Sequence, residues 1–406
     1  MPGRQQVTLK ANKRRPNNFS LVDVRGGQSP GRIFKTLLPA SLIIKISRGL
    51  IDVDVAYRYF GLLALIHATY CDEVGHGEER NFEQRMVIAL REQLVADGVP
   101  ESEVFGWLKF KKLNAHFLMR TDFALDDLSL HWSSLITSFG ETVCLDEKMR
   151  KFLGSSPYKR FCPNKPEPRG HWTSQLCTWL DGVHTPFCFG MYPVLSNADL
   201  RESVPVETIW DWAIKLTNRP ARPMIVADSY YSTKNVLEKL ECEGVPFLVA
   251  GATNRFEELA QRASSVVHEQ GESSVLRKEG SDVLLVHHWD VRTNIGRKFV
   301  FTNNFSITDS AKPSAGQHLV YRAYSLSFDA CDYFNRKLFK FKYPFRRRGW
   351  EKNFDSLFVS TLLINSWVLW QYSNPSHRGT IKLREFCHEL GLDLIKDPNP
   401  LVARQY

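Results

Sequence analysis

Residues 142–166 read TVCLDEKMRKFLGSSPYKRFCPNKP. The stretch opens with four strand-forming residues, Thr142 to Leu145, and then reaches Asp146 and Glu147. Acidic residues are poor strand formers, so a carboxylate directly after an apolar run predicts a strand that ends at the rim of a sheet. Basic residues follow at once: Lys148, Arg150, Lys151, Lys159, Arg160 and Lys165. One carboxylate among so many cations is expected where a metal ion and a polyanion meet. On these residues alone, a strand end followed by a solvated basic loop explains the pattern equally well.

Length and composition limit the class of protein. A chain of 406 residues has room for two or three domains, and 43% hydrophobic with 24% charged residues is typical of a soluble globular protein. The balance of 53 Lys+Arg against 44 Asp+Glu gives a net charge of +9, which favours a polyanionic partner. The eight cysteines form no Cys-x-x-Cys pair, so we expect no zinc site and a reducing compartment. The longest apolar run, 357–370, is too short to span a bilayer, and no membrane is expected.

The first 140 residues are predicted to form two units. Residues 1–34 carry basic side chains among Gly, Pro, Asn and Gln, which indicates a basic flexible arm. Residues 35–140 have helical periodicity; Phe82, Met86, Leu90 and Leu94 repeat every fourth position. We therefore expect an all-helical N-terminal domain over these residues.

Strand patterns then alternate with helices, which predicts an α/β fold. The run 223–227 is apolar throughout and ends in Asp228, as in a central strand covered on both faces. Residues 141–250 are predicted to be the first part of an α/β core, with ligands at strand ends. A β-rich insertion domain is expected over 251–317. The core should resume over 318–372, followed by a C-terminal helical tail over 373–406.

Three aspartates have positions that suit metal-dependent chemistry: Asp146 and Asp228 after strands, and Asp332 on a helix beyond the insertion. Phosphoryl transfer by two divalent ions needs converging carboxylates that hold the ions about 3.5–4 Å apart. Mg²⁺ prefers hard oxygen ligands of this kind. Taken singly, an aspartate in such a place is more often a helix cap or an ion-pair partner than a ligand.

Three sequence blocks resemble those of piggyBac-type transposases. DEKMRKFLGSSPYKRFCPNKPEPRG (146–170) is similar to the first catalytic block, Asp-Glu-Gln followed by Phe-x-Gly-Arg and Pro-Asn-Lys-Pro with a later Gly. VADSYYSTKNVLEKL (226–240) resembles the second block, an Asp after an apolar strand followed by an aromatic residue and a Leu-rich helix. The segment 324–370 resembles the third, Tyr-Asn and Gly-Gly-Val-Asp before an Arg-Trp unit and an apolar helix. The similarity covers about residues 118–394.

The resemblance implies an RNase H-like catalytic core interrupted by the insertion, with Asp146, Asp228 and Asp332 as the catalytic, metal-binding triad. It implies two Mg²⁺ (or Mn²⁺) ions, nicking at transposon ends, a hairpin intermediate and insertion into an AT-only target. Double-stranded DNA, a homodimer and a nuclear location follow as expectations, and the helical domain 35–140 is expected to serve dimerisation or DNA binding. Five basic residues are expected to contact DNA phosphates: Lys165, Arg169, Arg346, Arg347 and Arg348.

The chain also departs from the family pattern. Asp329-Ala330 replaces Gly-Gly, Cys331 replaces Val, Ser325 replaces Asn, and Asn335 stands where many members carry a further Asp. We expect neither the cysteine-rich, zinc-binding C-terminal module nor the acidic N-terminal region. Two alternatives therefore remain beside an active transposase: a domesticated, catalytically inactive DNA- or chromatin-binding protein, and a plain RNase H-like nuclease. The insertion argues against the nuclease.

Overall fold

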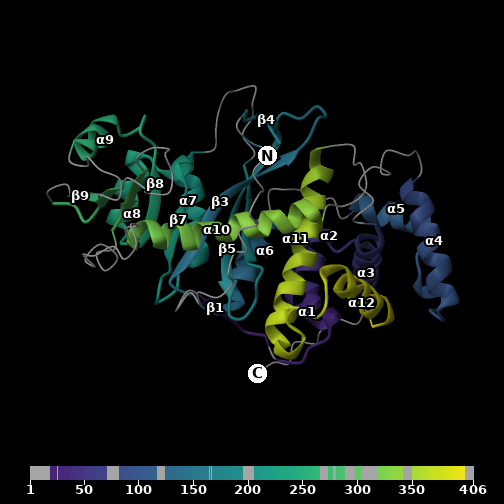
Figure 1. Cartoon of the computed structure of the whole chain (residues 1–406). Coiled ribbons are helices and arrows are strands. Elements are labelled where there is room, and N and C mark those ends of the chain that lie inside the picture. Colours follow the sequence, from purple (N-terminus) through teal and green to yellow (C-terminus); the bar gives the residue numbers. More distant parts are fainter. Residues whose placement is uncertain are drawn as a thin grey trace, which may run out of the picture.

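The computed structural model describes residues 19–24, 26–70, 82–116, 124–163, 165, 167–194, 205–265, 273–277, 280–288, 298–303, 319–341 and 350–397. One mixed sheet runs through the centre of these residues (Figure 1). Within it, β3 (Thr142–Lys151) is antiparallel to β5 (Arg169–Leu180) and parallel to β7 (Met224–Ala227). β6 (Phe187–Pro193) and the short β4 (Arg160–Phe161) pair with β5, and β8 (Phe247–Gly251) lies parallel to β7.

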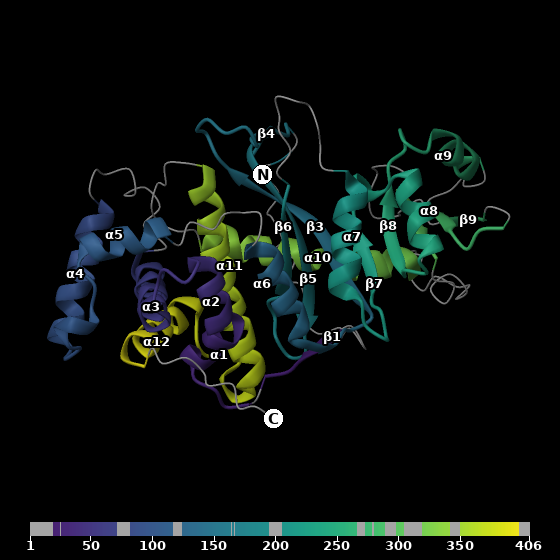
Figure 2. The same ribbon diagram turned by 180° about the vertical axis from the view of Figure 1, so that it is seen from behind.

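Helices cover both faces of this sheet. α10 (Leu319–Lys340) crosses one face, and α7 (Val206–Thr217) and α8 (Lys234–Cys242) lie on the other (Figures 1 and 2). Successive residues of a strand point to opposite faces, so β7 contributes to two separate cores. Met224 and Val226 pack with Val320 of α10, whereas Ile225 and Ala227 belong to the main core. The prediction of a central strand covered on both sides is confirmed.

The segment 251–317, expected to be a β-rich insertion domain, contributes strands that continue the sheet. β11 (Lys298–Thr302), β10 (Leu284–His288) and β9 (Ser273–Arg277) follow β8 in that order, each antiparallel to its neighbour. α9 (Glu257–Ser264) contacts β9 and β10. The sequence periodicity predicted strands in this segment, and strands are found. Without β11, β8 would be an edge strand with unpaired backbone groups, so the pairing of β11 with β8 satisfies these groups.

The beginning of the chain differs from the expected arm. β1 (Phe19–Val22) pairs with β5 and with β2 (Ile136–Ser138), so the region 35–140 also ends in a strand rather than a helix. α1 (Pro30–Leu37) starts after the cap Ser29, and its Ile33 and Phe34 are fully buried. A few apolar residues among many polar ones were enough to anchor this segment. Residues 1–18 lie outside the described chain.

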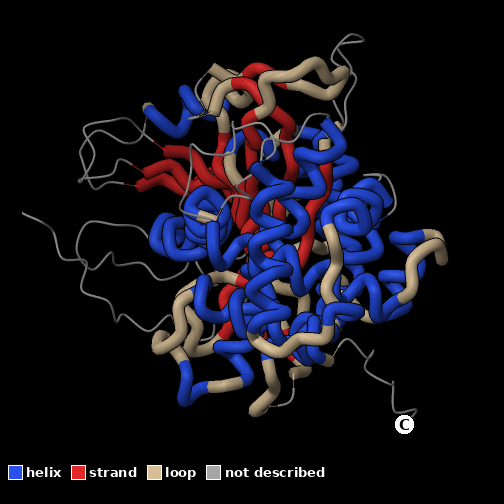
Figure 3. The backbone as a smooth tube through the Cα atoms, turned by 90° about the vertical axis from the view of Figure 1, so that its right-hand side faces the viewer, coloured by secondary structure: helices blue, strands red, loops and turns tan. Residues whose placement is uncertain are grey.

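The N-terminal and C-terminal helices form one helical block beside the sheet. The N-terminal members are α1, α2 (Ala40–Ser47), α3 (Val53–Tyr70), α4 (Phe82–Ala96), η2 (Glu101–Glu103), α5 (Trp107–His116) and α6 (Ala124–Ser134). The C-terminal members are α11 (Trp350–Ser373), η6 (Pro375–His377) and α12 (Leu383–Lys396). Figure 3 views the molecule from the right-hand side of Figure 1, and there helices lie in front of much of the sheet.

Two glycines explain how closely α3 and α12 approach. A Cβ added at Gly391 would lie 2.5 Å from Leu65 Cγ and 2.8 Å from the Gly61 carbonyl oxygen, so neither position has room for a side chain. α12, which lies in the segment expected to be a C-terminal helical tail, therefore packs into the helical block. No helix in the described part of the chain has the length and apolar character to cross a membrane.

Candidate active site

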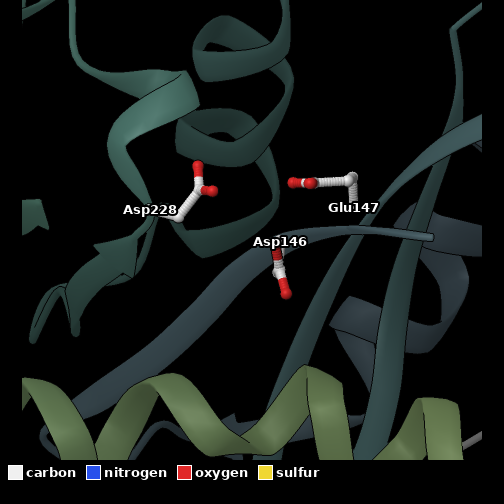
Figure 4. Close-up of side chains that lie close together, drawn as sticks. All are labelled: Asp146, Glu147 and Asp228. Atoms are coloured by element: carbon white, nitrogen blue, oxygen red, sulfur yellow. The ribbon is translucent and has the colours of Figure 1, made fainter. Parts of the chain in front are cut away.

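Asp146 and Asp228 meet where two parallel strands stop pairing. Leu145 lies opposite Ala227 in the last residue pair of β3 and β7, and each aspartate is the next residue along. The ends of parallel strands lie at the same sheet edge, so the two carboxylates come together with Glu147. One ligand atom from each of Asp146, Glu147 and Asp228 lies within 4.8 Å of the others (Figure 4).

β3 does not end at Asp146, contrary to the sequence prediction. It continues to Lys151 because β5 still pairs with it, from Asp146 opposite Gln175 to Lys151 opposite Gly170. Alternation along this strand sets the side-chain directions. The Cys144 thiol donates to the Phe328 carbonyl oxygen of α10 (3.1 Å), so Asp146, two residues on, faces α10. Glu147 points the other way, toward Asp228 (Figure 4).

The three acids are mostly buried, which is costly for negative charge. Asp146 and Glu147 are each 7% exposed. Burial, with the nearby charges of Glu147 and Asp228, raises the pKa of Asp146 well above its ordinary value. Burial and the charge of Glu147 raise the pKa of Asp228 to about 6. The ammonium of Lys165 forms an ion pair with Glu147, and this pair raises the pKa of Lys165 although burial opposes the rise.

This arrangement fits a hard divalent cation. Lys165 forms its ion pair with Glu147, one of the three carboxylates, and the Oε2 atom of Glu147 is buried without a hydrogen-bond partner in the described residues. Carboxylate oxygens are the ligands that Mg²⁺ and Mn²⁺ prefer, and a cation would balance the excess negative charge. Asp146, Glu147 and Asp228 are the residues that could hold it.

The turn that carries Asp228 is held in two ways. Asp228 caps η4 (Ser229–Tyr231), and its Oδ1 accepts a hydrogen bond from the Tyr230 backbone N–H at 2.7 Å. One nitrogen of Arg255, Nη1, donates to the carbonyl oxygens of Ser229, Tyr230 and Ser232 at 2.8, 2.9 and 3.0 Å. Sequence reasoning missed Arg255, because nothing in its local sequence marks it. It also passed over Glu147, whose signal was its place beside Asp146 in the first block.

Asp332 is not a member of the acid group. It is exposed on α10, whereas Asp146 and Asp228 are together in the group with Glu147. Its neighbour Cys331 faces the sheet, with its thiol donating to the Cys144 carbonyl oxygen at 3.4 Å. Consecutive helical residues differ by about 100° in direction, so Asp332 points away from that contact. The expected convergence of three aspartates is therefore found for two of them.

The structure places two of the five predicted DNA-binding residues. Lys165 forms an ion pair with Glu147 at the acid group, so its charge is partly neutralised within the protein. Arg169, at the start of β5, is exposed, and its guanidinium lies 5.4 Å from the centre of the Phe161 ring. Arg346, Arg347 and Arg348 lie outside the described residues.

The sequence of this chain matches a known family, and its fold resembles a solved structure. The model of a family described as transposase IS4 matches residues 124–367, more than half of the chain and a region that contains all three acids. The chain belongs to this transposase family. No curated protein sequence matches the chain. Among solved structures, this transposase-family chain is similar to a cryo-EM structure of the piggyBac transposase synaptic complex with hairpin DNA. The TM-score is 0.67 at 16% identity, and the match covers 94% of this chain and 84% of the other.

Proposed function

We propose that this chain is a piggyBac-type DNA transposase that nicks and joins DNA strands at transposon ends. The observation that carries the proposal is the meeting of Asp146, Glu147 and Asp228 at one sheet edge in a chain of a transposase family. The likeness in fold to a piggyBac transposase solved with hairpin DNA supports double-stranded DNA as the substrate.

Each part of the site has a role in this proposal. Bound divalent ions, two Mg²⁺ or Mn²⁺, would activate the attacking oxygen and stabilise the leaving oxygen at the phosphate. Asp146, Glu147 and Asp228 hold the ions, and the strands β6, β5, β3, β7 and β8 are the RNase H-like core that positions them. Lys165 and Arg169 hold DNA phosphates near the acids. Arg346, Arg347 and Arg348 are further candidates for phosphate contacts.

The remaining features of the proposal follow from the family resemblance. They are recognition of transposon ends, an AT-rich target, a homodimer and a nuclear location. The net charge of +9 supports a nucleic-acid partner.

One observation favours a second candidate, a domesticated DNA-binding protein that has lost the reaction. Asp332, the residue at the family's third acidic position, is exposed and outside the acid group. A protein that keeps the fold and binds DNA without cutting it has no need for a third acid near the metals.

A strand-cleavage assay separates the two candidates. Purified protein is incubated with a labelled transposon-end duplex and Mg²⁺ or Mn²⁺. A transposase nicks the duplex, and Asp228→Asn lowers the nicking rate at least about a hundredfold because a carboxylate ligand is lost. Asp332→Asn in the same assay reports whether the third acid takes part. If the wild-type protein binds the duplex but never nicks it with either metal, the DNA-binding candidate is correct.

A further inference from the structure

Gln175 is a buried amide without a partner beside the acid group. Its side chain is 0% exposed, and neither Nε2 nor Oε1 has a hydrogen-bond partner among the residues that the structure describes. Buried polar groups are nearly always hydrogen bonded, because an unpaired one loses its water without compensation. The sequence motifs give this residue no role.

The sheet places Gln175 next to Asp146. The two residues lie directly opposite each other in the antiparallel pair of β3 and β5, and such partners share a face with Cβ atoms about 4.5–5.5 Å apart. Asp228 follows β7, which is the neighbour of β3 on the other side. Asp146 therefore has an acid on one side and an unpaired amide on the other.

Two-ion chemistry needs oxygen ligands on both sides of a shared carboxylate. On the Asp228 side, Glu147 and Asp228 supply them. Asp332, the expected third acid, is not part of the group, and the residue directly opposite Asp146 on β5 is Gln175. The amide oxygen of a glutamine is a neutral, hard ligand that Mg²⁺, Mn²⁺ and Ca²⁺ accept.

We propose that Gln175 is a ligand of a divalent cation bound to Asp146, on the side away from Asp228. This inference rests on the proposed metal-dependent function. It accounts for the unpaired amide oxygen of Gln175, because a cation bound to Asp146 would be its partner. The competing explanation is a buried water molecule, since Thr173 Oγ1 on the same strand is also buried and unpaired.

The test is Mn²⁺ binding by the full chain without DNA. Isothermal titration calorimetry measures the affinity, and the Mn²⁺-induced rise in melting temperature provides a second measurement. Gln175→Leu keeps the side-chain size and removes both polar atoms. We expect it to weaken Mn²⁺ binding about tenfold or more, while the metal-free melting temperature stays equal or rises. Gln175→Glu should lower the metal-free melting temperature, because it buries a further acid, and Mn²⁺ should then raise it by more than in wild type.

Thr173→Val is the matched control, because it removes an unpaired buried oxygen from the same face of β5 opposite Lys148 instead of Asp146. It should leave Mn²⁺ affinity unchanged. If Gln175→Leu and Thr173→Val both bind Mn²⁺ like wild type, water fills the site and the inference is wrong. If the wild-type chain itself binds no Mn²⁺, the proposed metal-dependent function is wrong. This outcome differs from the one that contradicts only the role of Gln175.

Discussion

At the residue scale, the half-buried carboxylate of Asp228 links proton binding to stability. Its pKa is raised from 3.8 to about 6 by burial and by Glu147. The folded protein therefore binds this proton more tightly than the unfolded chain does. The stabilising contribution is complete below the unfolded pKa and is lost as the pH rises through 6. Above that pH, the metal-free protein carries a charge that its surroundings oppose.

Asp228→Asn should remove this pH dependence. We expect the variant to gain stability relative to wild type between about pH 4 and 7, by on the order of 2 kcal/mol at neutral pH without metal. Chemical unfolding at several pH values measures the difference. The exposed Asp97, changed to Asn, is the control and should track wild type throughout. A difference between Asp228→Asn and wild type that stays constant over this range would contradict the assignment.

At the scale of elements, sequence patterns predicted the central strands better than their neighbours. The apolar run before Asp228 identified a strand buried on both faces, and Asp228 itself was correctly expected at the end of this strand. The same reasoning ended β3 at Asp146, because strand propensity is local and the pairing of Lys151 with Gly170 is not. A Cβ at Gly170 would lie 1.9 Å from the Arg150 carbonyl oxygen, so the glycine of the first block permits this close pairing. Neither the unpaired amide of Gln175 nor the three bonds of Arg255 has a local sequence signal.

The η4 turn gives a prediction at this scale. Arg255 binds three carbonyl oxygens of the segment that follows Asp228, although it lies beyond β8 in the chain. Arg255→Ala should loosen the turn and weaken both Mn²⁺ binding and DNA nicking about tenfold or more, with little change in global melting temperature. Arg262→Ala, an exposed arginine of α9, is the matched control and should behave like wild type. If Arg255→Ala binds Mn²⁺ with wild-type affinity, the hydrogen bond from the Tyr230 N–H to Asp228 is sufficient to hold the turn.

At the scale of the whole molecule, the question is whether DNA is held at the acid edge or by overall charge. Arg169 starts β5 beside the β3 segment that follows the acids, whereas Arg222 precedes β7 at the opposite end from Asp228. Both arginines are exposed, and either change to Glu alters the net charge of +9 by the same amount. General attraction would therefore fall equally in the two variants.

A DNA path across the acids predicts different results for the two substitutions. Arg169→Glu should weaken binding to a DNA duplex and reduce the slope of log affinity against log salt concentration by about 1, because one phosphate contact is lost. Arg222→Glu should leave the slope at the wild-type value. Fluorescence anisotropy over a salt series measures both. Equal slopes in the two variants would show that Arg169 makes no phosphate contact, and that the basic surface beside the acids attracts DNA only through the charge of the whole chain.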